Sequence, residues 1–337
     1  MCPLLADSST PTEREALEPR AIYQSIQEEL AEVENRLRSV SKVEFNRLSE
    51  LLRHSLKGGG KRIRPALVLL SGKFYDYNPP QLILMATAVE LFHIATLVHD
   101  DTVDNSAVRH WQPTVNKIWG QDAAVLLGDY LFAKAGEFSS STENLRVIKL
   151  FSQTLMTISS GEINQAFSAF NLEQNFQDYL QRISSKTASL FSMATESGAV
   201  LSRAPEKSIQ ALKGYSYNLG IAFQIVDDIL DFIATDEEMG KPIGSDLAQG
   251  TLTLPAMLLL ERYPENNPVK RLFQNRDKQE NIKLAIELVR NSSIVQDCYS
   301  LASDYCARAC HNLKQLPDNP ARQPLTELAN YVVNRKR

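Results

Sequence analysis

Apolar residues recur at three- and four-residue steps along almost the whole chain, and this spacing constrains the fold more than any other feature. Segments with this spacing cover 25–40, 43–56, 82–100, 123–138 and 281–314. Such spacing is typical of helices that bury one face or their entire surface. Alternating patterns bounded by turn residues, which would indicate strands, are nearly absent. The sequence therefore predicts an all-α fold, a single large helical bundle spanning 1–337 with apolar helices at its centre.

Composition fits one domain of this kind. The chain has 337 residues, 43% of them hydrophobic, and no tract rich in Pro, Gly or Ser divides it. A net charge of −4 argues against general nucleic-acid binding. Residues 1–20 show no secretory signal pattern and are expected to form a flexible arm. No run of about 18 apolar residues is evident, so no membrane span is expected.

The four cysteines of the chain indicate the redox state of its cellular compartment. Cys2, Cys298, Cys306 and Cys310 have no paired metal-ligand spacing. Cys306 and Cys310 are expected to be small, mostly buried side chains of one helix rather than ligands or a disulfide. A reducing compartment, and hence a cytoplasmic location, fits this pattern best.

Two clusters of aspartates end apolar helical segments and share one spacing. Asp100, Asp101 and Asp104 follow a core-like run, and the second cluster has the same D-D-x-x-D order at 227–231. Residues four apart share a helix face, so the outer two carboxylates of each cluster should point together. Carboxylates this close repel one another unless a cation lies between them, and oxygen ligands favour Mg²⁺. The pattern predicts a diphosphate held by metal ions at the mouth of an apolar cavity.

Basic residues that would complete such a site occur in a fixed order along the chain. Three glycines at 58–60 precede Lys61, Arg62 and Arg64, without the spacing of a P-loop. Arg109 follows the first acidic cluster, Lys186 and Thr187 lie in an apolar helix, and Lys241 follows the second cluster. Each residue alone reads as a solvated surface charge. Together they suit a highly charged anion.

In these motifs the chain resembles the trans-isoprenyl diphosphate synthases, in particular the polyprenyl branch that makes long products. The likeness covers about residues 50–260. It rests on the stretches GGKRIRP, HDDTVD with a downstream Arg, GDYL, KTASLF, FQIVDDILD and GKPIGSDL.

The resemblance implies a role for each matching residue. Asp100 and Asp104 would bind two Mg²⁺ and Asp227 a third, supported by Asp231 and Gln224, while Asp101 and Asp228 would serve in an outer shell. Arg109, Lys186 and Lys241 would grip the allylic diphosphate, and Thr187 would be a further substrate-binding residue. Lys61, Arg64 and His93 would hold isopentenyl diphosphate. The expected reaction joins the two by head-to-tail addition, and homodimers are common in the family.

Product length should depend on side chains below the first cluster. Ala95 and Thr96, one turn before Asp100, are small and leave the expected tunnel open, whereas Phe132 is a candidate for a deeper floor. A helical turn rises ~5.4 Å, close to one extended isoprene unit, so a long central helix accommodates roughly seven to ten units. A shorter geranylgeranyl or farnesyl product is the alternative. The lipid product would be passed to a membrane.

The sequence also departs from the family pattern. His110 and Trp111 replace a second Arg, which helps hold isopentenyl diphosphate, and a Gly; Asn116 and Thr251 are also unusual. These changes keep open a regulatory or partner subunit of a heteromeric synthase. Two other enzyme classes fit less well. A terpene cyclase would not need Lys61 and Arg64 together with a second aspartate cluster. A metal phosphohydrolase of the His-Asp type would need more histidine ligands than this chain has. The C-terminal basic residues 335–337 are expected either to cover the substrate mouth or to form a solvated tail.

Overall fold

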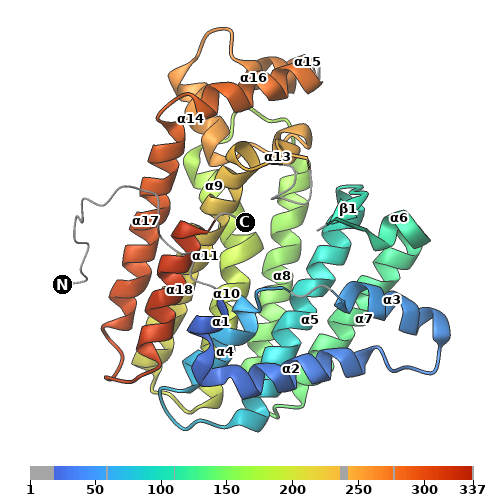
Figure 1. The fold of residues 1–337 in the computed structure, drawn as a ribbon, viewed down its shortest axis with the longest axis vertical. Helices are drawn as coiled ribbons and strands as arrows, with labels where there is room; N and C mark the ends of the chain where they lie inside the picture. Colours follow the sequence, from blue (N-terminus) through green and yellow to red (C-terminus); the bar gives the residue numbers. More distant parts are fainter. Residues whose placement is uncertain (1–18, 58–59, 110, 236–241, 276–277, 336–337) are drawn as a thin grey trace.

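A computed structural model describes residues 19–57, 60–109, 111–235, 242–275 and 278–335, and within these ranges the all-α prediction is confirmed. Long helices run side by side through the centre, and short helices close both ends (Figure 1). The only strands in the described part are a two-residue antiparallel pair, β1 (Val108–Arg109) and β2 (Gln112–Pro113).

Eight of the described helices pack together as the main bundle. They are α4 (Ile63–Gly72), α5 (Pro79–Val103), α7 (Gln121–Ser140), α8 (Leu145–Phe167), α10 (Ser189–Leu201), α11 (Glu206–Ile233), α17 (Ile294–Leu313) and α18 (Arg322–Asn334). The flanking and connecting helices are α1 (Pro19–Ile22), η1 (Gln24–Ile26), α2 (Gln27–Val40), α3 (Asn46–Leu56), α6 (Val115–Trp119), α9 (Phe176–Ile183), η2 (Ser184–Ala188), α13 (Ser245–Ala248), α14 (Leu254–Arg262), α15 (Pro268–Asn275) and α16 (Lys278–Arg290).

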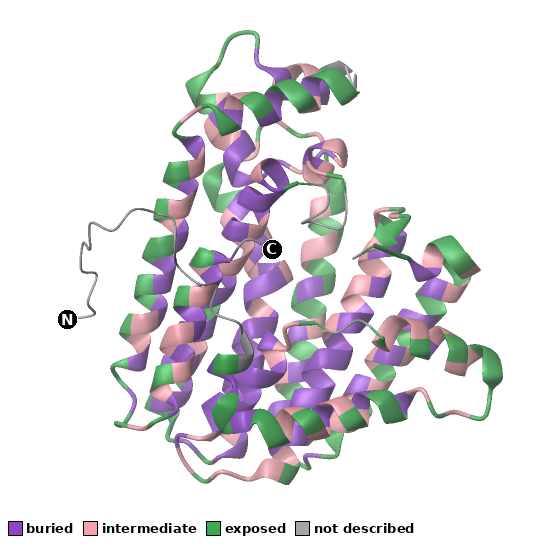
Figure 2. Cartoon of the chain, viewed as in Figure 1, coloured by how far each residue is buried: buried purple, intermediate pink, exposed green. Residues whose placement is uncertain are grey.

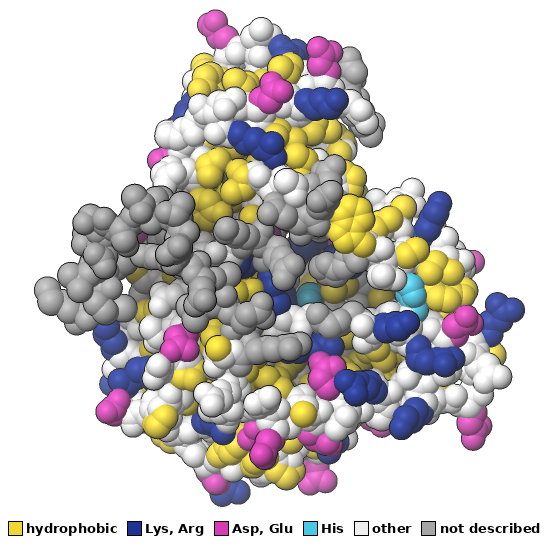
Figure 3. All heavy atoms as spheres, in the orientation of Figure 1, with side chains coloured by type: hydrophobic (Ala, Val, Ile, Leu, Met, Phe, Trp, Pro, Cys, Tyr) yellow, Lys and Arg dark blue, Asp and Glu magenta, His cyan; other side chains and the backbone are white. Residues whose placement is uncertain are grey.

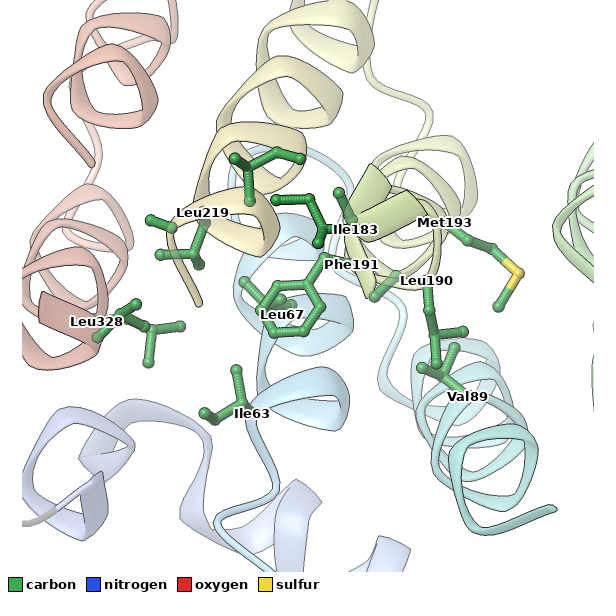
Figure 4. Packing of buried hydrophobic residues seen from close by; sticks show 14 of the residues in the cluster. Ile63, Leu67, Val89, Ile183, Leu190, Phe191, Met193, Leu219 and Leu328 are labelled. Atoms are coloured by element: carbon green, nitrogen blue, oxygen red, sulfur yellow. The ribbon is translucent and has the colours of Figure 1, made fainter. Parts of the chain in front are cut away.

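Burial is concentrated where these helices meet (Figure 2). Side chains from α4, α5, α10, α11 and α18 converge in one hydrophobic cluster, in which Phe191 is fully buried (Figure 4). The cluster draws on residues from both ends of the chain. That the whole of 1–337 is one domain stays a prediction.

Helix α5 carries the first acidic cluster and is apolar around most of its circumference. It begins at Pro79, which suits the first turn because proline lacks the N–H that a helix start leaves unpaired. By length and composition α5 could cross a membrane. This property is weak evidence for a span, and the expectation of no membrane span stays a prediction. Because 72% of its most apolar window is buried inside the protein, the core of the bundle accounts for this composition.

Two glycines allow close packing around η2, a π-helix that interrupts the step from α9 to α10. A Cβ at Gly161 of α8 would lie 2.6 Å from the Cβ of Ser185, and one at Gly220 of α11 would lie 2.6 Å from the Cα of Ala188. Real Cβ atoms do not approach other atoms this closely. Glycine at both positions therefore lets α8 and α11 pack against η2, and π-helical turns of this kind are frequent at functional sites.

The described cysteines form no disulfide, as expected. Cys298 and Cys306 are buried and Cys310 is half-buried. Burial raises the pKa of the Cys306 thiol to about 12, so this group is an inert core side chain.

Candidate active site

The first acidic cluster closes α5, and its three carboxylates differ in their contacts. Asp101 is buried and accepts a hydrogen bond from Arg109 Nε at 2.7 Å. Asp100 and Asp104 lie beside the ammonium of Lys186, with Lys186 Nζ 3.6 Å from Asp100 Oδ2. Burial raises the pKa of Asp104, and Lys186 opposes that rise. Asp100 and Asp104 are thus the carboxylates that share a cationic neighbour, whereas Asp101 anchors Arg109.

The second cluster, in α11, also divides its roles. Asp227 accepts a hydrogen bond from Arg335 Nη2 at 2.6 Å. Asp228 is buried and accepts from Tyr179 Oη at 2.8 Å and Gln224 Nε2 at 2.9 Å. Burial raises the pKa of Asp228 to about 7, with the charge of Asp246 adding to the rise. Only Asp227 of this pair is partly exposed to solvent.

Asp231 lies one turn beyond Asp227 and is buried against the segment that follows α11. Its carboxylate accepts from Ser245 Oγ at 2.9 Å and from the Asp246 backbone N–H at 3.2 Å. In this structure Asp231 therefore holds the turn that begins α13. Its expected support of a metal ion at Asp227 stays a prediction.

Adjacent residues of η2 join the two clusters. Lys186 lies beside Asp100 of α5, and Thr187 Oγ1 donates to Gln224 Oε1 at 2.7 Å, whose amide group in turn donates to Asp228 of α11. Burial lowers the pKa of Lys186, but the surrounding carboxylates outweigh it and raise the pKa above its ordinary value. Because one helical turn lies beside the first cluster and is linked to the second through Gln224, the two acidic helix segments border the same site.

The cations on the Asp227 side lie against aromatic rings. The Arg335 guanidinium stacks 3.9 Å from the centre of the Phe223 ring, and the Arg64 guanidinium lies 4.9 Å from that of Phe191. Burial lowers the pKa of Arg64 to about 10, and its Nε is enclosed without a hydrogen-bond partner. A guanidinium group held on a ring directs its edge toward an anion, and in Arg335 this edge binds Asp227.

Lys61 completes this basic group, and Arg62 does not belong to it. Lys61 Nζ lies 5.6 Å from the Tyr331 ring of α18. Arg62 adopts a left-handed backbone conformation, φ 51°, and its side chain binds the carboxylates of Glu34 and Glu90. Basic and histidine side chains are visible in the central hollow of this face in Figure 3.

The residues expected to set product length lie below the first cluster. Ala95 is fully buried, and Thr96 Oγ1 donates to the His93 carbonyl at 2.7 Å within α5. Phe132 of α7 contacts Phe92 edge-to-face, with centroids 5.2 Å apart. His110, Lys241 and residues 1–18 of the flexible arm predicted at 1–20 lie outside the described residues. The last two residues of that predicted arm are helical, since α1 begins at Pro19.

Comparison with known proteins places the chain among its relatives. The profile of the polyprenyl synthetase family matches residues 45–289. The chain belongs to this family. It is 36% identical over 314 residues to heptaprenyl diphosphate synthase component 2 of Bacillus subtilis, covering 93% of this chain and 90% of that protein. It is 34% identical to chloroplastic solanesyl-diphosphate synthase 2 of Oryza sativa, covering 95% of this chain and 81% of that protein.

Solved structures agree with this membership. A decaprenyl diphosphate synthase from Rhodobacter capsulatus superposes with a TM-score of 0.88 at 37% identity, covering 95% of this chain and 99% of that one. A polyprenyl synthase from Caulobacter crescentus, solved with calcium and isoprenyl diphosphate, gives 0.90 at 33% identity, covering 96% and 100%.

One departure from the family pattern lies at a backbone position that favours glycine. Trp111, where the family commonly has Gly, adopts φ 61°, a backbone conformation in which glycine is unstrained. Its side chain is 58% exposed. The unusual Thr251 donates its backbone N–H to the Asp246 carbonyl at 2.8 Å, a contact that any residue except proline can make.

The donor atoms of the first cluster fit a hard divalent cation. Asp100 and Asp104 offer carboxylate oxygens and are partly exposed. Within the described ranges, no three acidic, histidine or cysteine side chains already form a closed ligand set. Mg²⁺ suits this arrangement because it keeps several waters and is usually held by one or two carboxylates together with phosphate oxygens.

Three residues that contact the site were not among the sequence-based candidates. Glu162 of α8 binds Lys186 at 2.9 Å, Tyr179 of α9 donates to Asp228, and Asp246 lies near enough to raise the pKa of both Asp104 and Asp228. Asp246 was recognisable as part of the GKPIGSDL stretch. For the other two, nothing in the local sequence distinguishes them from a solvated acid and a core aromatic.

Proposed function

We propose that this polyprenyl synthetase is an Mg²⁺-dependent prenyltransferase that adds isopentenyl diphosphate head-to-tail to an allylic diphosphate. The observation that supports this best is the link that two neighbours on η2 make between the acidic clusters. Lys186 lies beside Asp100 of the first cluster. Thr187 binds Gln224, which in turn binds Asp228 of the second cluster. A site bordered by two carboxylate clusters and several cations suits two diphosphates and their metal ions.

Each group of residues has a distinct task in the reaction. Asp100 and Asp104 would hold two Mg²⁺ and Asp227 a third, and the bound cations would stabilise the charge that develops on the departing pyrophosphate. Lys186 and Arg109 bind the same leaving group directly. Lys61 and Arg64 orient the diphosphate of isopentenyl diphosphate so that its double bond faces the allylic carbon.

The apolar helices below the site protect the reaction. A carbocation forms when the C–O bond of the allylic diphosphate breaks, and the buried walls around Ala95 exclude water from it. Attack by the isopentenyl double bond forms the new C–C bond. Loss of a proton, which the released pyrophosphate accepts, then gives a trans product one unit longer.

We propose a product of roughly seven to ten units. The 25 residues of α5 make about seven turns of ~5.4 Å, each close to one extended isoprene unit, which supports the lower end of this range. The relatives named as heptaprenyl, solanesyl and decaprenyl diphosphate synthases support this range. We also propose a cytoplasmic location, with the lipid product delivered to a membrane.

The test is an elongation assay on the purified chain. It uses Mg²⁺, labelled isopentenyl diphosphate and, separately, allylic primers of different length, with products separated by chromatography. Long products that disappear in Asp100→Ala support the proposal. Asp304→Asn, which changes an exposed aspartate of α17, is the matched control and should behave as wild type. Folded protein that elongates no primer would refute the proposal.

We further propose that the active form is a homodimer joined through α7 and α8. Leu126, Met156, Ile163 and Phe167 are 60–89% exposed, and the three on α8 recur at helical spacing along one face. Light scattering should give about twice the 37.8 kDa chain mass, and Phe167→Glu should give single chains.

A second candidate is a component of a heteromeric synthase. The Bacillus subtilis relative is named component 2, which favours a partner chain in that enzyme. A chain that is monomeric and inactive alone, and becomes active with a second subunit, would favour this candidate over the homodimer.

A further inference from the structure

Glu162 lies in the site although none of the site motifs includes it. Lys186 Nζ is 2.9 Å from Glu162 Oε1 and 3.6 Å from Asp100 Oδ2. Only the shorter of these distances is that of a hydrogen bond. The ammonium is therefore bonded to Glu162 of α8 and only adjacent to Asp100 of α5.

Packing between α8 and η2 fixes this arrangement. The missing side chain of Gly161 allows the backbone next to Glu162 to approach Ser185, the neighbour of Lys186. The side chains of Lys186, Glu162 and Asp100 are 31%, 28% and 19% exposed. At this depth water screens their charges less than at the surface. Which of the two carboxylates the Lys186 ammonium binds therefore affects the interaction energy of each carboxylate with a cation.

The consequence concerns Asp100. If Glu162 were neutral, Asp100 would be the nearest remaining carboxylate for the Lys186 ammonium, and an ammonium bonded there would compete with a divalent cation. The second cluster has a basic group in such a position, because Arg335 is bonded to Asp227.

We propose that Glu162 is a positioning residue that holds the Lys186 ammonium away from Asp100 and so keeps Asp100 open to a divalent cation. This inference rests on the proposed function, in which Asp100 is a metal ligand. Glu162 acts through Lys186 and need not touch the metal ion or either substrate.

The experiment measures cation binding without substrate. Mn²⁺ replaces Mg²⁺, and its unbound fraction is followed by electron paramagnetic resonance in wild type, Glu162→Gln, Lys186→Gln and the double variant. Glu162→Gln should weaken Mn²⁺ binding about fivefold to tenfold, the size expected when the cation must displace a partly buried ion pair. In the Lys186→Gln background the same change should matter less than about twofold, since no ammonium is left to move.

Two results would overturn the positioning role. An equal loss in both backgrounds would mean that Glu162 attracts the cation directly, and no loss in the wild-type background would mean that Lys186 does not move onto Asp100. Glu137→Gln on α7 is the matched control, because this carboxylate also binds a lysine, Lys134 at 2.6 Å, but lies at the surface. It should leave Mn²⁺ binding unchanged.

Failure of the proposed function would give a different result. Asp100→Asn should abolish the site that Glu162→Gln only weakens. A wild-type protein without any Asp100-dependent Mn²⁺ site would refute the metal assignment itself, and the positioning role with it. Retained helical circular dichroism in each variant separates these outcomes from misfolding.

Discussion

Replacement of Arg335 by Gln is expected to lower the thermal stability of the ligand-free protein. It should change the stability of the protein with bound Mg²⁺ and pyrophosphate only slightly. Arg335 is the residue that follows α18, and its side chain is 3% exposed. It donates to Asp227 Oδ1 at 2.6 Å and to the Phe223 carbonyl at 2.8 Å, and it stacks on the Phe223 ring. All three contacts are lost in the variant.

The magnitude follows from these contacts. Asp227 is 36% exposed, so water can solvate it when Arg335 is gone, and the ion pair is worth less than a fully buried one. We expect a loss of about 1–2 kcal/mol from the pair and its hydrogen bonds. The lost stack on Phe223 adds about 0.5–1 kcal/mol.

Thermal unfolding is the assay. At about 2.1 cal/mol/K per residue, a chain of 337 residues has an unfolding entropy of about 0.7 kcal/mol/K. A loss of about 2 kcal/mol therefore lowers Tm by about 3 °C. With saturating Mg²⁺ and pyrophosphate the difference should fall below about 1 °C, because a cation on Asp227 would already have displaced Arg335 in the wild type.

The control is Arg262→Gln, which removes another arginine–aspartate pair between helices, with Asp297, but at a more exposed position. It should shift Tm by less than about 1 °C with or without ligands. A Tm difference for Arg335→Gln that is the same in both conditions would refute the reasoning, since Arg335 would then stay on Asp227 in the loaded enzyme and exclude a metal ion there.

Three further predictions concern buried groups. The pKa of Asp228 is raised from 3.8 to about 7, so the folded protein retains a proton that the unfolded chain releases. The free energy of unfolding should therefore fall as pH rises from about 4 to about 7. In urea titrations with EDTA, Asp228→Asn should flatten this pH dependence, and an unchanged slope would contradict the assignment to Asp228. Ala95→Phe should shorten the chromatographed products by blocking the tunnel below Asp100, and retention of full-length products would show that the chain runs elsewhere. Phe132→Ala should lengthen the products if its ring is the floor, whereas loss of its contact with Phe92 alone should lower Tm by a few degrees without a change in length.

Periodicity and spacing predicted the features that depend on local sequence. Nearly continuous apolar character identified α5 as central, and the four-residue spacing placed Asp100 and Asp104 beside the same cation. The KTASLF stretch identified Lys186 and Thr187 as site residues. Lys186 lies beside Asp100, and Thr187 reaches the second cluster through Gln224. In each case one helix, or one turn of it, determines the geometry.

Contacts between distant segments could not be predicted in this way. The spacing of Asp227 and Asp231 suggests two equivalent carboxylates, yet one binds Arg335, more than one hundred residues away, and the other binds the turn at Ser245. Whether residues 335–337 cover the site or form a tail depends on where α18 packs. The sequence left both open, and the structure buries Arg335 at the site.

The two acidic clusters have the same sequence pattern but different neighbours, and the difference determines how each can receive a cation. At the first cluster the nearest ammonium, Lys186, is bonded to Glu162 and leaves Asp100 accessible. At the second the nearest guanidinium is bonded to Asp227 itself. A cation can therefore bind at Asp100 without breaking a hydrogen-bonded ion pair, since Lys186 is 3.6 Å away. A cation that binds Oδ1 of Asp227 must displace Arg335. Since an arginine that leaves a carboxylate needs another anion, a diphosphate beside Arg64 is the partner whose arrival would favour that exchange.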